Sequence, residues 1–133
     1  MMIDASAIVG ILNGESEARA LAAAIGAAKA RYTSPIAIYE ATVALVHENK
    51  WSADEAGEIV RQFLEAASIV TVAITDDMAT MAIQAFERFG EGRHPAQLNM
   101  GDCFAYACAR AQAGALLFKG EDFSKTNVND GGS

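Results

Sequence analysis

Four acidic residues stand where their carboxylates could act together. Asp4 closes a short apolar segment at the start of the chain, and Asp122 follows another apolar segment near its end. Glu40 is the lone acid in an otherwise apolar stretch, and Asp102 stands three residues after Asn99. Several carboxylates in one pocket repel one another and need a cation to stay ionised, and hard oxygen ligands suit Mg²⁺ or Mn²⁺. The chemistry expected of such a cluster is metal-assisted hydrolysis of a phosphodiester.

Each acid also has a purely structural explanation. Asp4 is suited to cap the helix that follows it, and Ser6 could bond to the Asp4 carboxylate or to its own turn. Asp102, at the third position of a helix, would stabilise that helix by ~0.5–1 kcal/mol. Glu40 could lie on a solvated helix edge, and Asp122 could be an ordinary turn residue. Their convergence in space therefore decides whether they form a site.

Short apolar strands alternate with helices along the chain, and this alternation would position the acids. The pattern predicts a three-layer α/β/α domain with a small parallel sheet, in which ligands gather beyond the carboxyl ends of the strands. Helix starts are predicted at Ser34-Pro35, at Ser52 with Glu55, at Thr75 and at Asn99. The expected strands are Met1–Asp4, Arg31–Thr33, Ile69–Ile74 and Ala115–Phe118, and the expected helices are Ser6–Leu12, Glu15–Lys29, Pro35 to about Asn49, Ser52 to about Ala67, Thr75 to about Phe89 and Met100 to about Gln112.

Gly101 is an unusual residue inside the last expected helix. Glycine lowers helix stability relative to alanine, and Gly101 stands directly before Asp102. We therefore expect another group to approach the helix backbone closely at this position.

Length, charge and cysteine content set limits on the class of protein. The chain has 133 residues, 52% of them apolar, which fits one domain over residues 1–133 with a frayed tail after about Val128. The formal net charge of −7 argues against a basic DNA-binding module, although an acidic site that holds its own cations stays possible. Cys103 and Cys108 are expected to be buried small apolar residues. With no membrane span and no leader pattern, we expect a cytoplasmic protein.

Three segments resemble motifs of a known family. Met2–Ile8 resembles the opening motif of PIN-domain ribonucleases, Arg93–Ala107 resembles the third motif of the VapC toxins, and Leu116–Thr126 resembles their closing motif. The run from His94 to Tyr106 is the most specific of these matches. The resemblance extends over nearly the whole chain, although Ala18–Lys29 and Trp51–Gln84 add little to it.

This resemblance implies a compact α/β/α domain that forms a homodimer and acts as a Mg²⁺- or Mn²⁺-dependent endoribonuclease. It further implies the toxin of a toxin–antitoxin pair, which cleaves structured RNA such as tRNA or ribosomal RNA, stops translation and is blocked by a VapB-like antitoxin. The metal-binding and catalytic acids would be Asp4, Glu40, Asp102 and Asp122. Ser6 and Asn99 would support these ligands by hydrogen bonding.

The chain departs from the family pattern at one position, and the motifs do not identify which residues bind RNA. Many relatives have an acid where Asn127 stands, which leaves the fourth ligand open. The cations near the later motifs are candidates for RNA contacts, although an ordinary solvated surface position is the more common explanation for each of them: Arg88, Arg93, His94, Lys119 and Lys125. The helices at Ser52–Ala67 and Met78–Phe89 are expected to carry surplus apolar surface for a dimer or partner interface.

Two other functions compete with the ribonuclease. A receiver-type signalling domain is also a small acidic α/β domain that binds Mg²⁺, and Asp76 or Asp77 after Ile69–Ile74 could accept its phosphoryl group. Such a domain also needs two adjacent acids after its first strand, whereas Asp4 stands alone there. A catalytically silent PIN-like binding module is the second alternative, and the filled acidic positions argue against it.

Overall fold

The computed structural model describes residues 1–120 and 123–128. The candidate acid Asp122 and the tail predicted to fray after about Val128 lie outside these residues. The strands are β1 (Met2–Ile3), β2 (Tyr32–Thr33), β3 (Val70–Thr71) and β4 (Leu116–Leu117). The helices are α1 (Ala5–Leu12), α2 (Ala18–Ala27), α3 (Pro35–Asn49), α4 (Ala53–Ala66), α5 (Asp76–Phe89) and α6 (Met100–Ala111), followed by the short 3₁₀ helix η1 (Phe123–Lys125).

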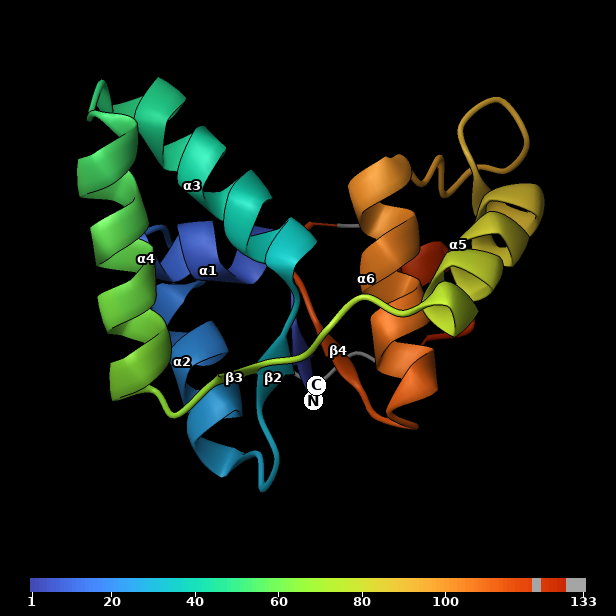
Figure 1. The fold of residues 1–133 in the computed structure, drawn as a ribbon, viewed down its shortest axis with the longest axis horizontal. Coiled ribbons are helices and arrows are strands. Elements are labelled where there is room, and N and C mark those ends of the chain that lie inside the picture. The colour runs from blue at the N-terminus through green and yellow to red at the C-terminus, as the bar shows by residue number, and fades with distance from the viewer. Residues whose placement is uncertain (121–122, 129–133) are drawn as a thin grey trace.

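The four strands form one parallel sheet in the order β3-β2-β1-β4. Met2 pairs with Tyr32 on one side and with Leu116 on the other, so β1 lies in the interior of the sheet. Figure 1 shows α1 to α4 grouped on one side of the strands and α5 with α6 on the other. The predicted three-layer α/β/α architecture with a small parallel sheet is confirmed.

The predicted helix starts are confirmed at the level of single hydrogen bonds. Ser34 caps α3 by accepting from the backbone N–H of Ala37, and Thr75 caps α5 by accepting from that of Met78. Ser52 and Glu55 form a complete capping box at the start of α4. Each side chain satisfies a backbone donor that the helix itself leaves without a partner.

All four strands and the second helix are shorter than the sequence pattern predicts, since each strand pairs through two residues. The difference is largest for the β-branched run Ile69–Ile74, of which only Val70–Thr71 pairs, as an edge strand beside β2. The helix predicted from Glu15 begins at Ala18 instead. Glu15 belongs to the preceding turn, where its carboxylate accepts from the ammonium group of Lys119 rather than from the start of the helix.

The core consists of side chains from both helical layers packed on the buried strands. Met2, Ile3, Leu116 and Leu117 are almost fully buried between the layers. Cys103 and Cys108 are buried with free thiols, and burial raises the pKa of each thiol to about 11. Among the described residues, no helix is long and apolar enough to cross a membrane.

Candidate active site

A pocket at the carboxyl edge of the sheet collects acidic side chains from separate elements. Asp4 follows β1 directly, Glu40 lies on the second turn of α3, and Asp102 lies on the first turn of α6. All three line the same pocket, together with Ser6, Glu15 and Lys119. In Figure 1 the start of α6 and the first turns of α3 lie above this edge of the strands. Three of the four predicted acids therefore share one pocket, at the edge where parallel α/β sheets bind ligands.

Asp4 is the most buried of these acids, and hydrogen bonds hold its carboxylate in place. Its side chain is 5% exposed. Oδ2 of Asp4 accepts from the backbone N–H of Ser6 at 3.0 Å and from the Ser6 hydroxyl at 2.6 Å. The Ser6 Oγ in turn accepts from the backbone N–H of Lys119 at 2.9 Å. Asp4 thus caps α1 and is also tied, through Ser6, to the chain that leaves β4.

Asp102 is held by a capping box at the start of α6. The backbone N–H of Asp102 donates to Oδ1 of Asn99 at 2.9 Å, and the backbone N–H of Asn99 donates to Oδ2 of Asp102 at 3.1 Å. Capping and participation in the pocket do not exclude each other at this position, because one carboxylate offers about four acceptor sites. The reciprocal bonds limit the orientations that the Asp102 carboxylate can adopt.

Glu40 is half-buried, and its carboxylate rests on the backbone of α6. A Cβ atom built on Gly101 would lie closer than 3.0 Å to all three atoms of this carboxylate. The group that approaches the helix at Gly101 is therefore the Glu40 carboxylate. Burial raises the pKa of Glu40 above its ordinary value, and the nearby Asp4 carboxylate raises it further. Both effects make a negative charge at Glu40 unfavourable when no cation is bound.

Lys119 is the one cation among the described residues that line this pocket. Its Nζ lies 2.7 Å from Oε2 of Glu15 and 3.5 Å from Oε2 of Glu17. The hydrogen bond to Glu15, more than any other contact, raises the pKa of Lys119. The sequence pattern placed Glu15 at the start of a helix, and no local pattern identifies a partner more than 100 residues away.

The donor chemistry of the pocket fits a divalent cation. Asp4, Glu40 and Asp102 provide hard carboxylate oxygens, which Mg²⁺ and Mn²⁺ prefer. Within residues 1–120 and 123–128, no three His, Cys, Asp or Glu side chains are grouped closely enough to hold a metal ion together. Mg²⁺ does not require three protein ligands, because it keeps several waters and is commonly bound by one or two carboxylates.

The residues near the closing motif are only partly described. Asp122, predicted as the fourth acid, lies outside the described residues, and its position therefore stays a prediction. The side-chain oxygen of Asn127 accepts from the hydroxyl of Tyr106 on α6. Lys125 lies in a neighbouring polar hollow that Asn99 and Asp102 also line, so this cation adjoins the acidic pocket.

The other cations near the later motifs have structural contacts of their own. His94 accepts from the backbone N–H of Ala96 at its Nδ1 and packs edge-on against Phe89. Arg93 pairs with Glu87 and lies over the ring of Phe86. Arg88 lies 4.8 Å from the centre of the Phe89 ring. None of these three lines the acidic pocket within the described part of the chain.

The acids required by a receiver-type domain lie elsewhere. Asp76 and Asp77 occupy the first turn of α5, where the segment that leaves the edge strand β3 ends. Neither residue lines the pocket that contains Asp4. A phosphoryl group on either residue would thus lie outside the pocket that the other acids line, and the receiver-type alternative is not supported.

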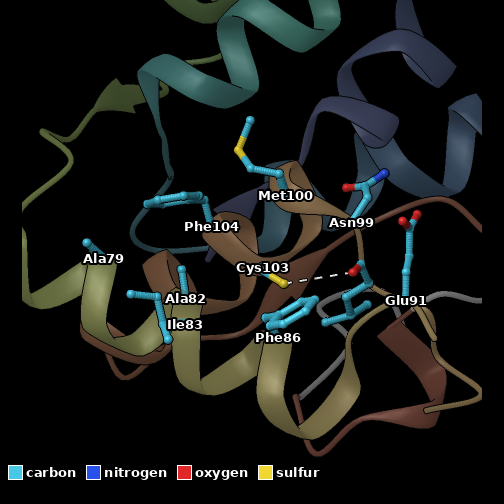
Figure 2. A pocket seen from close by; sticks show the side chains of 10 residues that line it. Ala79, Ala82, Ile83, Phe86, Glu91, Asn99, Met100, Cys103 and Phe104 are labelled. Carbon is cyan, nitrogen blue, oxygen red and sulfur yellow. Dashed lines mark hydrogen bonds between the residues drawn. The ribbon is translucent and has the colours of Figure 1, made fainter. Parts of the chain in front are cut away.

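An apolar groove lies between α5 and α6 and adjoins the polar hollow, because Glu91 and Asn99 line both. Ile83 and Phe86 from α5 face Cys103 and Phe104 from α6 across this groove (Figure 2). Ile83 is 67% exposed, and Met100, at the upper end of the groove, is 64% exposed. The surplus apolar surface predicted for Met78–Phe89 is therefore present, whereas none of the large exposed apolar residues lies on α4.

Comparisons with known proteins agree with this architecture. Residues 1–129 match the family model of the PIN domain. The chain is 41% identical over 128 residues to Ribonuclease VapC of Mycolicibacterium smegmatis, a match that covers 96% of this chain and 97% of the relative. It is 39% identical to Ribonuclease VapC30 of Mycobacterium tuberculosis, with 96% and 95% of the two chains covered.

Solved structures of low sequence identity share the fold. VapC20 of Mycobacterium tuberculosis, described as a toxin that cleaves the sarcin-ricin loop, superimposes with a TM-score of 0.73 at 15% identity, covering 96% of this chain and 95% of the other. A toxin-antitoxin complex from Klebsiella pneumoniae gives a TM-score of 0.70 at 16% identity, with 95% and 92% covered. At these identities the likeness concerns the fold alone.

Proposed function

The chain belongs to the PIN-domain family, and from this premise we propose that it is a toxin-type endoribonuclease that hydrolyses RNA phosphodiester bonds at its acidic pocket. The observation that carries the proposal is the convergence of Asp4, Glu40 and Asp102, from three separate elements, at one edge of the sheet. Relatives that are named ribonucleases match the chain at 39–41% identity over nearly its full length. The RNA-cleaving activity and the toxin role extend to this chain on that basis.

Mg²⁺ or Mn²⁺ is the proposed cofactor, held mainly by Asp4 and Asp102 with Glu40 completing the cluster and Asp122 proposed as the fourth acid. When bound, such an ion lowers the pKa of a water molecule and neutralises charge on the leaving oxygen. The chain itself prepares this site, because Ser6 orients Asp4 and Asn99 orients Asp102 through the hydrogen bonds described above. Ligands that are fixed in advance lose little conformational freedom on binding.

Local cations are proposed to hold the RNA against the unfavourable net charge of −7. Lys125 is the best placed, because it is exposed in the hollow that shares Asn99 and Asp102 with the acidic pocket. Lys119 contributes less, since Glu15 and Glu17 already neutralise it. A structured RNA such as tRNA or ribosomal RNA is the proposed substrate, which would place the protein in the cytoplasm.

A VapB-like antitoxin is the proposed partner of the acidic pocket. The described lining combines Asp4, Glu15, Glu40 and Asp102 with a single lysine. A partner that covers this pocket is therefore expected to present basic side chains, which complement the excess of negative charge. Binding in this mode would block access of RNA to the carboxylates.

A homodimer is proposed to form through the apolar groove between α5 and α6. Ile83, Phe86 and Met100 expose large apolar side chains there, and Glu91 is the one charged residue in the described lining. Because two copies that each carry −7 repel one another, they approach most easily where charge is sparse. A second copy of the chain is thus the partner that we expect to bind in the groove between α5 and α6.

Cleavage of total RNA by purified, antitoxin-free protein tests the proposed activity. We expect discrete fragments with Mg²⁺ or Mn²⁺, none with EDTA, and none with Asp4→Asn. Asparagine keeps the cap of α1, so this variant is expected to fold normally by circular dichroism. Cleavage that persists in Asp4→Asn would identify a contaminant or remove Asp4 from the site. If the protein does not cleave RNA and does not arrest growth on expression, the catalytically silent binding module is favoured.

A further inference from the structure

Gly101 is a glycine whose backbone conformation does not require one. It occupies the second position of α6, and its φ is not in the left-handed region that Gly14, Gly92 and Gly120 adopt. Alanine fits helical backbone and favours the helix over glycine. The residue is also buried. A neighbouring group that occupies the space of a side chain, rather than the backbone conformation, must therefore be the reason for a glycine here.

That neighbour is the carboxylate of Glu40. The three atoms nearest to a Cβ built on Gly101 are Oε2, Cδ and Oε1 of Glu40, and all three lie closer than 3.0 Å. The crossing of α3 over the start of α6 thus brings the carboxylate onto bare helix backbone, one residue before Asp102. A helix carries partial positive charge at its first turn, which offsets part of the cost of placing a carboxylate there.

We propose that Gly101 is a positioning residue, whose lack of a side chain lets the Glu40 carboxylate reach the ion-binding pocket beside Asp4 and Asp102. This inference rests on the proposed metal-dependent function. A Cβ at position 101 would displace the carboxylate end of Glu40 rather than the backbone, because that end belongs to a flexible side chain. The folded structure would survive, and one carboxylate would leave its place.

The proposal predicts opposite effects on stability and on metal binding. Gly101→Ala is expected to leave the melting temperature unchanged or higher, because alanine favours the helix. The affinity for Mn²⁺ is expected to fall about 10- to 100-fold, the usual effect of losing a residue that orients metal ligands. Gly57→Ala in α4 is the matched control, since its Cβ would meet only Thr42, at 4.0 Å, and it does not line the pocket.

The experiment measures Mn²⁺ affinity by electron paramagnetic resonance and the melting temperature in EDTA, in the parent chain and in Glu40→Ala. In the parent chain, Gly101→Ala weakens Mn²⁺ binding, whereas Gly57→Ala does not. In Glu40→Ala, Gly101→Ala causes no further loss of affinity, because no carboxylate remains to displace. The change in melting temperature caused by Gly101→Ala differs between the two backgrounds, and that caused by Gly57→Ala is the same in both.

Two results would overturn the positioning role. The first is that Gly101→Ala binds Mn²⁺ as tightly as the parent does. The second is that Gly101→Ala changes the melting temperature by the same amount in the parent and in Glu40→Ala. Failure of the proposed function looks different. If the parent itself does not bind Mn²⁺ while the melting shifts still depend on Glu40, then Gly101 seats the carboxylate but the pocket is not a metal site, and its role toward the ion is rejected.

Discussion

Asp102 combines a helix cap and a pocket carboxylate at one position, and substitutions can separate the two. Asp102→Asn keeps an oxygen that accepts from the backbone N–H of Asn99, but it removes the negative charge. We expect a near-normal melting temperature. RNA cleavage should fall by more than about 100-fold, because losses of about 10- to 100-fold are typical of residues that only support the ligands.

Asp102→Ala supplies the comparison for this prediction, because it removes the charge together with the acceptor for the backbone N–H of Asn99. Its melting temperature should fall by the equivalent of ~1 kcal/mol, while cleavage should be lost as in Asp102→Asn. Normal cleavage by Asp102→Asn would assign Asp102 to helix capping alone.

Glu40 is predicted to destabilise the metal-free protein. Burial and the neighbouring Asp4 raise its pKa in the folded state above the unfolded value. At pH values above this raised pKa, the ionised carboxylate therefore lowers the free energy of unfolding. Glu40→Gln is therefore expected to melt about 2 to 5 °C higher than the parent at neutral pH in EDTA. The difference should shrink as the pH falls through the raised pKa, where the parent carboxyl takes up a proton.

Glu58→Gln is the control for this measurement, because Glu58 holds the corresponding position of α4 and is exposed. It should leave the melting temperature unchanged at both pH values. A lower melting temperature for Glu40→Gln would instead mean that Glu40 stabilises the contact between α3 and α6.

At the scale of elements, two capping boxes of the same type have different consequences. Asn99→Ala at α6 and Ser52→Ala at α4 each remove a side chain that accepts from the third residue of the helix. Each should cost ~1 kcal/mol of stability. Only Asn99→Ala should also reduce RNA cleavage, because its box holds Asp102. Equal activity of the two variants, measured at a temperature where both are folded, would argue that the cap does not orient this carboxylate.

The capping residues also show how much of the fold the sequence could reveal. Ser34-Pro35, Ser52 with Glu55, Thr75 and Asn99 act within three or four residues of themselves, so their helices were predicted with starts correct to one residue. The run Ile69–Ile74 has strong strand character, but its pairing depends on a neighbour on only one side. The length of this strand in the sheet could thus not be predicted from its own residues.

Three acids of the pocket could be predicted from the sequence, whereas their contacts and the membership of Glu15 could not. The placement of Asp4 after a strand, and of Glu40 and Asp102 early in helices, pointed to these three, and the cost of Gly101 indicated a close approach. That the approaching group is Glu40 depends on the crossing of α3 over α6, which joins residues 61 positions apart. The pairing of Lys119 with Glu15 likewise depends on the sheet, which places the end of β4 beside the turn after α1.

For the whole molecule, the distribution of charge and apolar surface predicts where a second copy binds. Ile83 is 67% exposed in a groove with a single charged residue among its described lining. Ile83→Glu would introduce a negative charge in each copy at the proposed interface, and like charges across an interface cost several kcal/mol. We expect light scattering after gel filtration to give the mass of a dimer for the parent and of a monomer for Ile83→Glu.

Val70→Glu distinguishes this interface from the exposed apolar surface on the edge strand β3. Val70 is 63% exposed on the edge strand β3 and does not line the groove. The variant should remain dimeric if the copies meet through α5 and α6. If Val70→Glu were monomeric and Ile83→Glu dimeric, the two sheets would be joined edge to edge through β3. A monomeric parent would reject the second copy, and the groove would then be open to the antitoxin.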